Sequence, residues 1–247
     1  MAKLLVVQKS VIVRGVFKEL LEKNTDFEYD TVATYAQAKE LLEKKTYSYG
    51  VVERNLEDAP KGEIIALFNK HNIAPLVFTK EIDEVFFDSF ESAKIVDYIL
   101  KQKYNNITYV VQRLKQLQAN KNITVLVVSD SSTYGSYLKE NLNIHNFNVL
   151  SATNNQEAYE KLEINPDISL MIVDNIEPNI NALELIENIR QRKDKKSLKI
   201  MVLAEKPNLY FTSSLLNAGA NDYIIKPFSR DEFYVRVYQN IKLILPN

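Results

Sequence analysis

The sequence predicts an α/β protein made of two similar halves, each a five-stranded parallel sheet with helices on both faces. Short apolar runs, rich in β-branched residues, alternate with amphipathic stretches along the whole chain. Such runs are typical of strands buried on both faces of a parallel sheet, and regular alternation of strand and helix favours the α/β class. The same series of runs occurs twice, which predicts two domains.

The individual elements follow from these runs in chain order. In the first half the predicted strands are 4–7, 27–33, 49–52, 75–78 and 95–100. In the second half they are 123–128, 147–152, 168–173, 198–203 and 222–226. Apolar residues at helical spacing predict helices at 16–23 and 107–119.

The two halves align residue by residue at their predicted strand ends. The aligned pairs are Lys9 with Asp130, Glu53 with Asp174, Thr79 with Ala204, and Lys101 with Lys226. The first two pairs are 121 residues apart and the last two 125 apart, so the second copy is four residues longer. Residues 120–122 read Asn-Lys-Asn and are polar, so we place the domains at 1–119 and 123–247.

Composition excludes several classes of function. The chain has 31 Lys and Arg residues against 32 Asp and Glu, which argues against a nucleic-acid or anionic-membrane surface built from bulk charge. It has no Cys, which excludes disulfides and zinc sites that use Cys. His71 and His145 are the only histidines, and we expect both at the surface. No apolar stretch approaches ~18 residues, so we expect a cytoplasmic protein without a membrane span.

Chemically useful side chains stand at the predicted strand ends of the second half. In an open α/β sheet, function gathers at the carboxyl ends of the strands. These ends carry Ser129-Asp130, Asp174, Ala204 and Lys226. Two carboxylates at adjacent strand ends can chelate a hard divalent cation. An Asp that faces both a metal and an ammonium is a candidate nucleophile for phosphoryl transfer.

This constellation resembles the receiver domain of two-component response regulators, and the resemblance covers the whole chain as two receivers in tandem. Its motifs are DNIEP at 174–178, LNAGANDY at 216–223 and DYIIKPF at 222–228. Each motif alone is weak, but together, at these spacings and in this order, they are specific. The resemblance implies two flavodoxin-like (CheY-like) domains, each with strand order 2-1-3-4-5.

The resemblance also implies roles for residues of the second copy. Asp174 would accept a phosphoryl group, and Lys226 would hold the phosphoryl oxygens. Mg²⁺ would be bound by Asp130, Asp174 and the backbone carbonyl of Ile176. Tyr223 would be the aromatic switch residue.

The second copy departs from the family pattern at two positions. Ser129 stands where the family has the first acid of a pair, so we expect weaker Mg²⁺ binding. Ala204 stands where the family has Thr or Ser, so the hydroxyl that couples the phosphoryl group to the switch is missing. We therefore expect weak transmission to Tyr223.

The first copy departs further and resembles a degenerate receiver. Gln8-Lys9 replaces the acidic pair and Glu53 replaces the acceptor, while Thr79, Tyr98 and Lys101 match the family pattern. Coulomb attraction would favour a contact between Lys9 and Glu53 and would exclude a divalent cation.

The resemblance implies signalling partners rather than enzymatic activity in this chain. A sensor histidine kinase or a phosphotransfer protein would supply the phosphoryl group. A homodimer could form through the helix 4–strand 5–helix 5 face, roughly 208–243, where the aromatic residues are Tyr223, Phe233, Tyr234 and Tyr238. Residues 104–119 are the corresponding helix in the first copy. Tandem receivers with one degenerate copy also resemble the regulatory half of response regulators that end in a diguanylate cyclase domain.

Two other classes of function compete with this interpretation. The chain could be a wholly degenerate receiver scaffold for protein–protein interaction, in which neither copy is phosphorylated. It could also be a small-molecule enzyme on a flavodoxin-like fold. The sequence contains neither G-x-G-x-x-G nor G-x-x-x-x-G-K-[ST], which argues against the enzyme.

Overall fold

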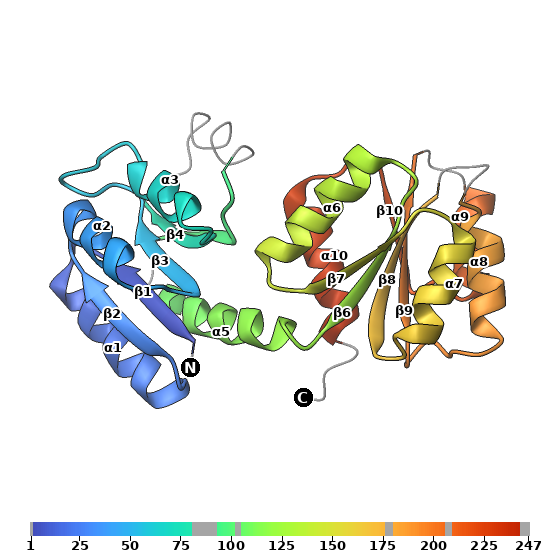
Figure 1. Ribbon diagram of the computed structural model, residues 1–247, viewed down its shortest axis with the longest axis horizontal. Helices are drawn as coiled ribbons and strands as arrows, with labels where there is room; N and C mark the ends of the chain where they lie inside the picture. The colour runs from blue at the N-terminus through green and yellow to red at the C-terminus, as the bar shows by residue number, and fades with distance from the viewer. Residues whose placement is uncertain (1, 81–92, 102–104, 176–179, 206–208, 243–247) are drawn as a thin grey trace. The chain divides into compact units, whose positions relative to one another are not determined.

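The computed structural model describes residues 2–80, 93–101, 105–175, 180–205 and 209–242, and it divides into two compact units, Met1–Gln118 and Ala119–Asn247 (Figure 1). Each unit contains one five-stranded sheet in which all neighbouring strands pair in parallel. The strand order is β2-β1-β3-β4-β5 in the first unit and β7-β6-β8-β9-β10 in the second. The predicted order 2-1-3-4-5 is confirmed in both.

The elements of the first unit alternate between strand and helix. They are β1 (Lys3–Val7), α1 (Val11–Asn24), β2 (Glu28–Val32), α2 (Tyr35–Lys44), β3 (Tyr49–Glu53), α3 (Glu63–Lys70), β4 (Pro75–Thr79), β5 (Asp97–Leu100) and α5 (Asn105–Asn120).

The second unit repeats this alternation. Its elements are β6 (Thr124–Val128), α6 (Ser132–Ile144), β7 (Asn148–Ala152), α7 (Asn155–Ile164), β8 (Ile168–Asp174), α8 (Ala182–Arg190), β9 (Lys199–Ala204), α9 (Leu209–Ala218), β10 (Asp222–Ile225) and α10 (Arg230–Lys242).

Polar N-cap residues start several helices within a few residues of the preceding strand. The side-chain oxygens of Ser10, Thr34, Ser131, Asn154 and Asn181 each accept a hydrogen bond from a backbone amide in the first turn of a helix. These bonds satisfy amides that lack an intrahelical partner. Because all strands of each sheet run parallel, the side chains at their carboxyl ends meet at one edge of that sheet.

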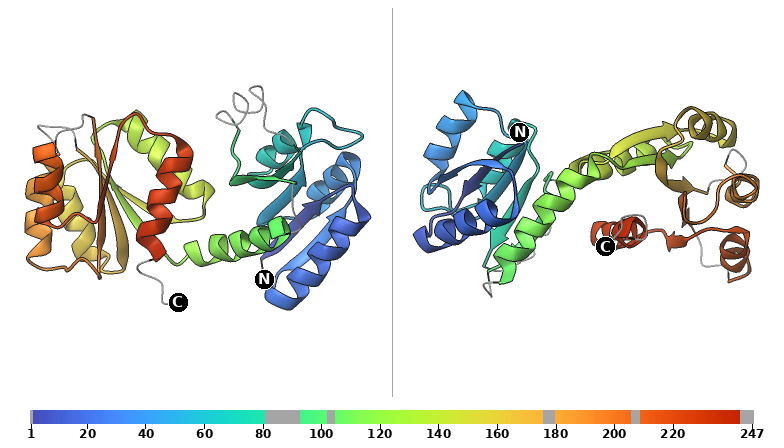
Figure 2. Two further views of the ribbon diagram at one scale, coloured as in Figure 1. Left: turned by 180° about the vertical axis from the view of Figure 1, so that it is seen from behind. Right: turned by 90° about the horizontal axis from the view of Figure 1, so that it is seen from below.

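Each sheet is covered by helices on both faces (Figures 1 and 2). In the second unit, α7, α8 and α9 pack on one face and α6 and α10 on the other. In the first unit, α2 and α3 share a core with one face of the sheet. Phe17 of α1 contacts Phe78 of β4 edge-to-face, with ring centroids 5.7 Å apart, on the other face. This three-layer arrangement explains why the strands read as continuous apolar runs.

The prediction that His145 lies at the surface is wrong. His145 is fully buried, because it follows α6 as its C-cap and stacks on Tyr234 with ring centroids 3.7 Å apart. Its Nδ1 lies 2.7 Å from the Tyr238 hydroxyl, and Asn120 donates to the His145 carbonyl at 2.7 Å and to the same hydroxyl at 3.1 Å. A buried polar network thus joins Asn120, His145 and Tyr238 within the second unit. None of the helices in the described part of the chain is long and apolar enough to cross a membrane.

Candidate functional site

The carboxyl edge of the second sheet brings together the side chains that the sequence singled out. Asp174 is the last residue of β8 and is fully buried. Ser129 and Asp130 directly follow β6, the neighbouring strand, and Lys226 directly follows β10. β8 lies centrally between β6 and β9, so Asp174 occupies the middle of this edge. This position matches the place where open α/β sheets bind their ligands.

Both carboxylate oxygens of Asp174 have a partner. Lys226 Nζ donates to Oδ1 at 2.6 Å, and the Ser129 hydroxyl donates to Oδ2 at 3.0 Å. The Ser129 and Lys226 side chains are themselves largely buried. Charge-assisted hydrogen bonds of this kind are strong, and without them a fully buried carboxylate would be costly. The arrangement holds a buried carboxyl group beside the Lys226 ammonium.

Tyr134 is a member of this site that sequence reasoning missed. Lys226 Nζ lies 4.8 Å from the centroid of the Tyr134 ring, within the range of a cation–π interaction. Burial, and secondarily the Asp174 carboxylate, raises the pKa of the Tyr134 hydroxyl. Tyr134 also contacts Phe228 edge-to-face at 6.5 Å. The sequence could have indicated this residue, because Tyr134 lies in the first turn of the helix that begins two residues after Asp130.

The Tyr134 side of the site opens into a pocket of about 430 Å³. It is lined by Tyr134, Tyr137, Glu205, Lys226, Pro227 and Phe228. The Lys226–Pro227 peptide is cis, as is common for the motif that it resembles.

Two carboxylates at this edge, those of Asp130 and Asp174, are of the donor type that a hard divalent cation prefers. Asp130 is partly exposed and lies one strand away from Asp174. Ile176, whose carbonyl is the third expected ligand, lies outside the described residues. Among the described residues there is no cluster of three or more acidic, His or Cys side chains that could hold a metal. Two carboxylates suit Mg²⁺, which usually keeps several waters and takes only one or two carboxylates from the protein.

The two expected switch positions lie on neighbouring strands. Ala204 ends β9, is almost fully buried, and accepts a hydrogen bond from the Lys226 amide at 2.7 Å. Tyr223, in β10, is half-buried and packs against the core beneath α7, α8 and α9. A methyl group therefore occupies the position beside Asp174 where the resemblance expects a hydroxyl.

The corresponding edge of the first sheet carries an ion cluster of different composition. Glu53 ends β3 and is almost fully buried. Lys101 Nζ lies 2.5 Å from its Oε1, and Lys9 Nζ lies 3.5 Å from the same oxygen. The Lys9 amide donates to Oε2 at 3.3 Å. The expected Lys9–Glu53 contact is present, and Lys101 joins it as a second ammonium.

The other residues singled out in the first copy are buried or half-buried, and of these Thr79 lines the pocket beside the cluster. Thr79 is buried at the end of β4, and Tyr98 is half-buried in β5. Gln8 is fully buried, and its side-chain amide makes no hydrogen bond within the described part of the chain. In the second unit, Ser129 donates a hydrogen bond to Asp174. Gln8, the larger side chain at the equivalent position of the first unit, makes no such bond to Glu53.

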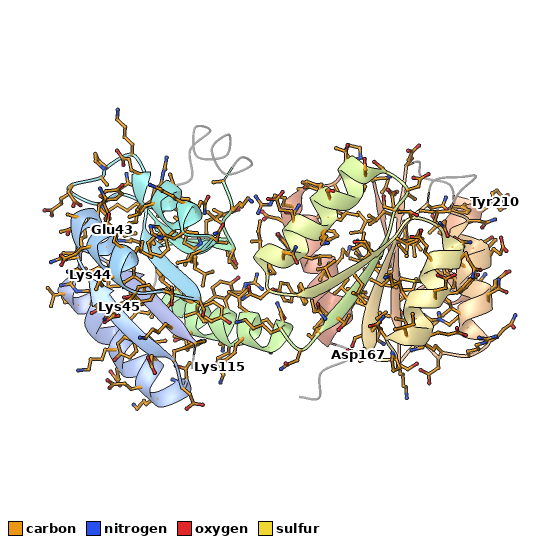
Figure 3. All side chains as sticks on the ribbon, in the orientation of Figure 1. Glu43, Lys44, Lys45, Lys115, Asp167 and Tyr210 are labelled. Carbon is orange, nitrogen blue, oxygen red and sulfur yellow. The ribbon has the colours of Figure 1, made fainter. Side chains whose placement is uncertain are left out.

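The predicted aromatic interface on the second unit is wrong for three of its four residues. Phe233, Tyr234 and Tyr238 are buried, because α10 uses them to pack on its own sheet. The exposed apolar side chains of α9 and α10 are different ones. Tyr210, at 90% exposed, projects from α9 (Figure 3). Leu216 and Val235 are also exposed.

Comparison with known proteins agrees with this geometry. Residues 125–238 match the family model of the response regulator receiver domain. The chain is 35% identical over 106 residues to the chemotaxis protein CheY1 of Helicobacter pylori, covering 42% of this chain and 86% of that protein. It is 32% identical over 113 residues to the response regulator ArlR of Staphylococcus aureus, covering 46% of this chain and 50% of ArlR.

Solved structures extend the likeness to both units. A putative two-component system response regulator/GGDEF domain protein superposes with a TM-score of 0.84 at 28% identity, covering 98% of each chain. A second protein described in similar terms gives a TM-score of 0.83 at 27% identity, again covering 98% of each chain. We conclude that the chain belongs to the response regulator receiver family and contains two receiver-like domains in tandem.

Proposed function

We propose that the second unit accepts a phosphoryl group on Asp174 and that the first unit is a degenerate receiver that does not. The observation that carries the proposal is the buried Asp174 carboxylate, 2.6 Å from Lys226 Nζ at the carboxyl edge of the sheet, with Asp130 one strand away. Family membership supports a role in two-component signalling.

The proposed chemistry is a transfer from a phosphohistidine on a sensor histidine kinase or a phosphotransfer protein. One carboxylate oxygen of Asp174 attacks phosphorus, the phosphorus–nitrogen bond breaks, and an acyl phosphate forms while the donor imidazole leaves. Lys226 shifts its hydrogen bond from the carboxylate to a phosphoryl oxygen and offsets the added negative charge. Mg²⁺, held by Asp130 and Asp174 when bound, would neutralise charge on the transferred group.

The first unit lacks these conditions. The Glu53 carboxylate is engaged by two ammonium groups, and Lys9 stands where a metal ligand is needed. A cation at that position repels a divalent metal ion. We assign residues 1–119 to this degenerate receiver and 123–247 to the phosphoaccepting one.

The output of the protein is proposed from analogy with the solved proteins. Both are described as response regulator/GGDEF domain proteins, which supports a diguanylate cyclase as the effector that phosphorylation regulates. A homodimer through the α9–β10–α10 face would use exposed Tyr210, Leu216 and Val235. Light scattering with and without beryllofluoride tests the dimer, and a monomer under both conditions removes it.

Intact mass spectrometry of the chain with acetyl phosphate and Mg²⁺ tests phosphorylation. The wild-type chain should gain one phosphoryl group, and Asp174→Asn should gain none. Asp167→Asn is a matched control, because Asp167 is an exposed carboxylate at the other end of β8 (Figure 3). Unmodified wild-type protein would instead support the scaffold function, which the replacements at Ser129 and Ala204 make the strongest alternative.

A further inference from the structure

The two sheet edges carry opposite charge at equivalent positions. In the second unit, Asp130, Asp174 and Lys226 give a formal charge of −1. In the first unit, the equivalent Lys9, Glu53 and Lys101 give +1. The sign of a site selects the sign of its ligand, because like charges in a partly buried site repel strongly. An edge that suits a cation in one unit therefore suits an anion in the other.

The edge of the first unit is also hollow. A pocket of about 180 Å³ lies there, lined by Lys9, Glu53, Arg54, Asn55, Phe78, Thr79, Lys80 and Lys101. Among these lining residues Glu53 is the only carboxylate, and four others are cationic, so the lining has a formal charge of +3. Glu53 itself is almost fully buried beneath the ammonium groups of Lys9 and Lys101.

The excess charge is not consumed by the internal ion cluster. Lys101 Nζ lies 2.5 Å from Glu53 Oε1 and so neutralises the charge of Glu53. Lys9 Nζ lies 3.5 Å from the same oxygen and also donates to the Asn55 carbonyl at 3.1 Å. The Lys9 side chain keeps about a third of its surface exposed. Lys80 is exposed at the pocket wall. Within the described part of the chain, the ammonium groups of Lys9 and Lys80 therefore remain able to meet a ligand, and the Lys101 ammonium can share its remaining protons with it.

From this charge reversal and this pocket, we propose that the first unit binds a small dianionic oxyanion of the phosphate type, without a metal ion. A phosphate group has acceptor oxygens in several directions, which suits ammonium groups that come from the ends of β1, β4 and β5. A pocket of about 180 Å³ suits free phosphate or the phosphate of a small phosphomonoester. This binding is noncovalent and goes beyond the proposed phosphorylation of Asp174.

NMR of the full chain allows both sites to be followed in one molecule. Inorganic phosphate is titrated into ¹⁵N-labelled protein with EDTA present, at constant ionic strength set by sodium chloride. Saturable shifts are expected at the amides of Lys9, Glu53 and Thr79, and none at Asp130 and Asp174. Glycerol phosphate in a parallel titration distinguishes a phosphomonoester from free phosphate as the better ligand, and either result supports the site.

Two lysine variants and a control locate the binding. Lys9→Met removes the reversed charge and should weaken phosphate binding about tenfold, the cost of one charge-assisted hydrogen bond. Lys80→Ala leaves the Glu53 cluster intact and should weaken it about two- to fivefold, as expected for an exposed charge. Lys18→Ala changes an exposed lysine of α1 away from the pocket and should have no effect.

Three results would overturn the proposal. The first is the absence of saturable shifts with either phosphate compound. The second is equal weakening by Lys80→Ala and Lys18→Ala, which would indicate general charge attraction. The third is phosphate-induced shifts confined to Asp130 and Asp174. None of these outcomes bears on whether Asp174 is phosphorylated, because the titration contains neither Mg²⁺ nor a phosphodonor.

Discussion

Replacing Ala204 by threonine restores a hydroxyl at the end of β9, next to the proposed acceptor. β8 and β9 pair with Asp174 opposite Leu203, so residue 204 lies one position beyond the acceptor on the neighbouring strand. A hydroxyl there could donate to a phosphoryl oxygen on Asp174. In the wild-type chain only a buried methyl group is available at this place. Phosphorylation should therefore move Tyr223 and β9 weakly.

The size of the effect follows from the missing hydrogen bond. A hydrogen bond to a charged group is worth ~1.5–3 kcal/mol. A ligand shifts a conformational equilibrium only through its differential contacts with the two states. A contact worth ~1.4 kcal/mol, near the lower end of this range, already changes the ratio of the two states tenfold. Ala204→Thr should thus increase the switched population in the phosphorylated form about tenfold.

The assay is NMR of Tyr223 and α9 with and without beryllofluoride, which mimics the phosphoryl group. Ala204→Val is the matched control, because valine has the shape of threonine without the hydroxyl. Threonine should enlarge the beryllofluoride-dependent shifts, and valine should not. If the wild-type chain already switches fully, or if valine acts like threonine, the coupling runs through other contacts and the reasoning is refuted.

Three further changes test other contacts. Tyr134→Leu removes the ring that faces the ammonium of the acceptor site and should slow phosphorylation a few-fold, since a cation–π contact is worth ~0.5–2 kcal/mol; Tyr134→Phe keeps the ring and should restore the rate in the same mass assay. Asp58 accepts hydrogen bonds from two backbone amides at the start of α2, at 2.9 and 3.0 Å, and these bonds lower its pKa. Asp58→Ala should therefore reduce the free energy of unfolding, measured in urea at neutral pH, by ~1 kcal/mol. Because the carboxylate stabilises the fold only while it is ionised, this difference should shrink as the pH falls below about 4. A difference that does not depend on pH would contradict this. Tyr238→Phe removes the hydroxyl hydrogen bonds to His145 and Asn120 and should cost ~1–3 kcal/mol in the same urea experiment, whereas an unchanged midpoint would show that this network does not stabilise the unit.

The strand order and the edge of the site could be predicted because they depend on patterns within the sequence. Apolar runs predicted the strands, and the repeat predicted two sheets. The rule that ligands bind at the carboxyl ends of strands placed Asp130, Asp174 and Lys226 at one edge of the second sheet. Coulomb attraction between opposite charges at the aligned strand ends predicted the contact between Lys9 and Glu53, which is present. These are properties of spacing and of chain direction.

The remaining features depend on side-chain packing that spacing does not determine. His145 follows a helix and was expected at the surface, yet Tyr234 and Tyr238 of α10 enclose it. The same aromatics were expected at an interface, but periodicity alone does not distinguish a core-facing helix stripe from an exposed one. Tyr134 was missed because its contact with Lys226 joins residues 92 positions apart.

Identification of the phosphorylated residue tests the central claim most directly. The full chain is treated with acetyl phosphate and Mg²⁺ and then reduced with borohydride, which converts an aspartyl phosphate to homoserine. Peptide mapping should find homoserine at position 174 and an unmodified Glu53 in the same molecules. Modification at Glu53, or phosphorylation that persists in Asp174→Asn, would contradict the division into one phosphoaccepting and one degenerate receiver.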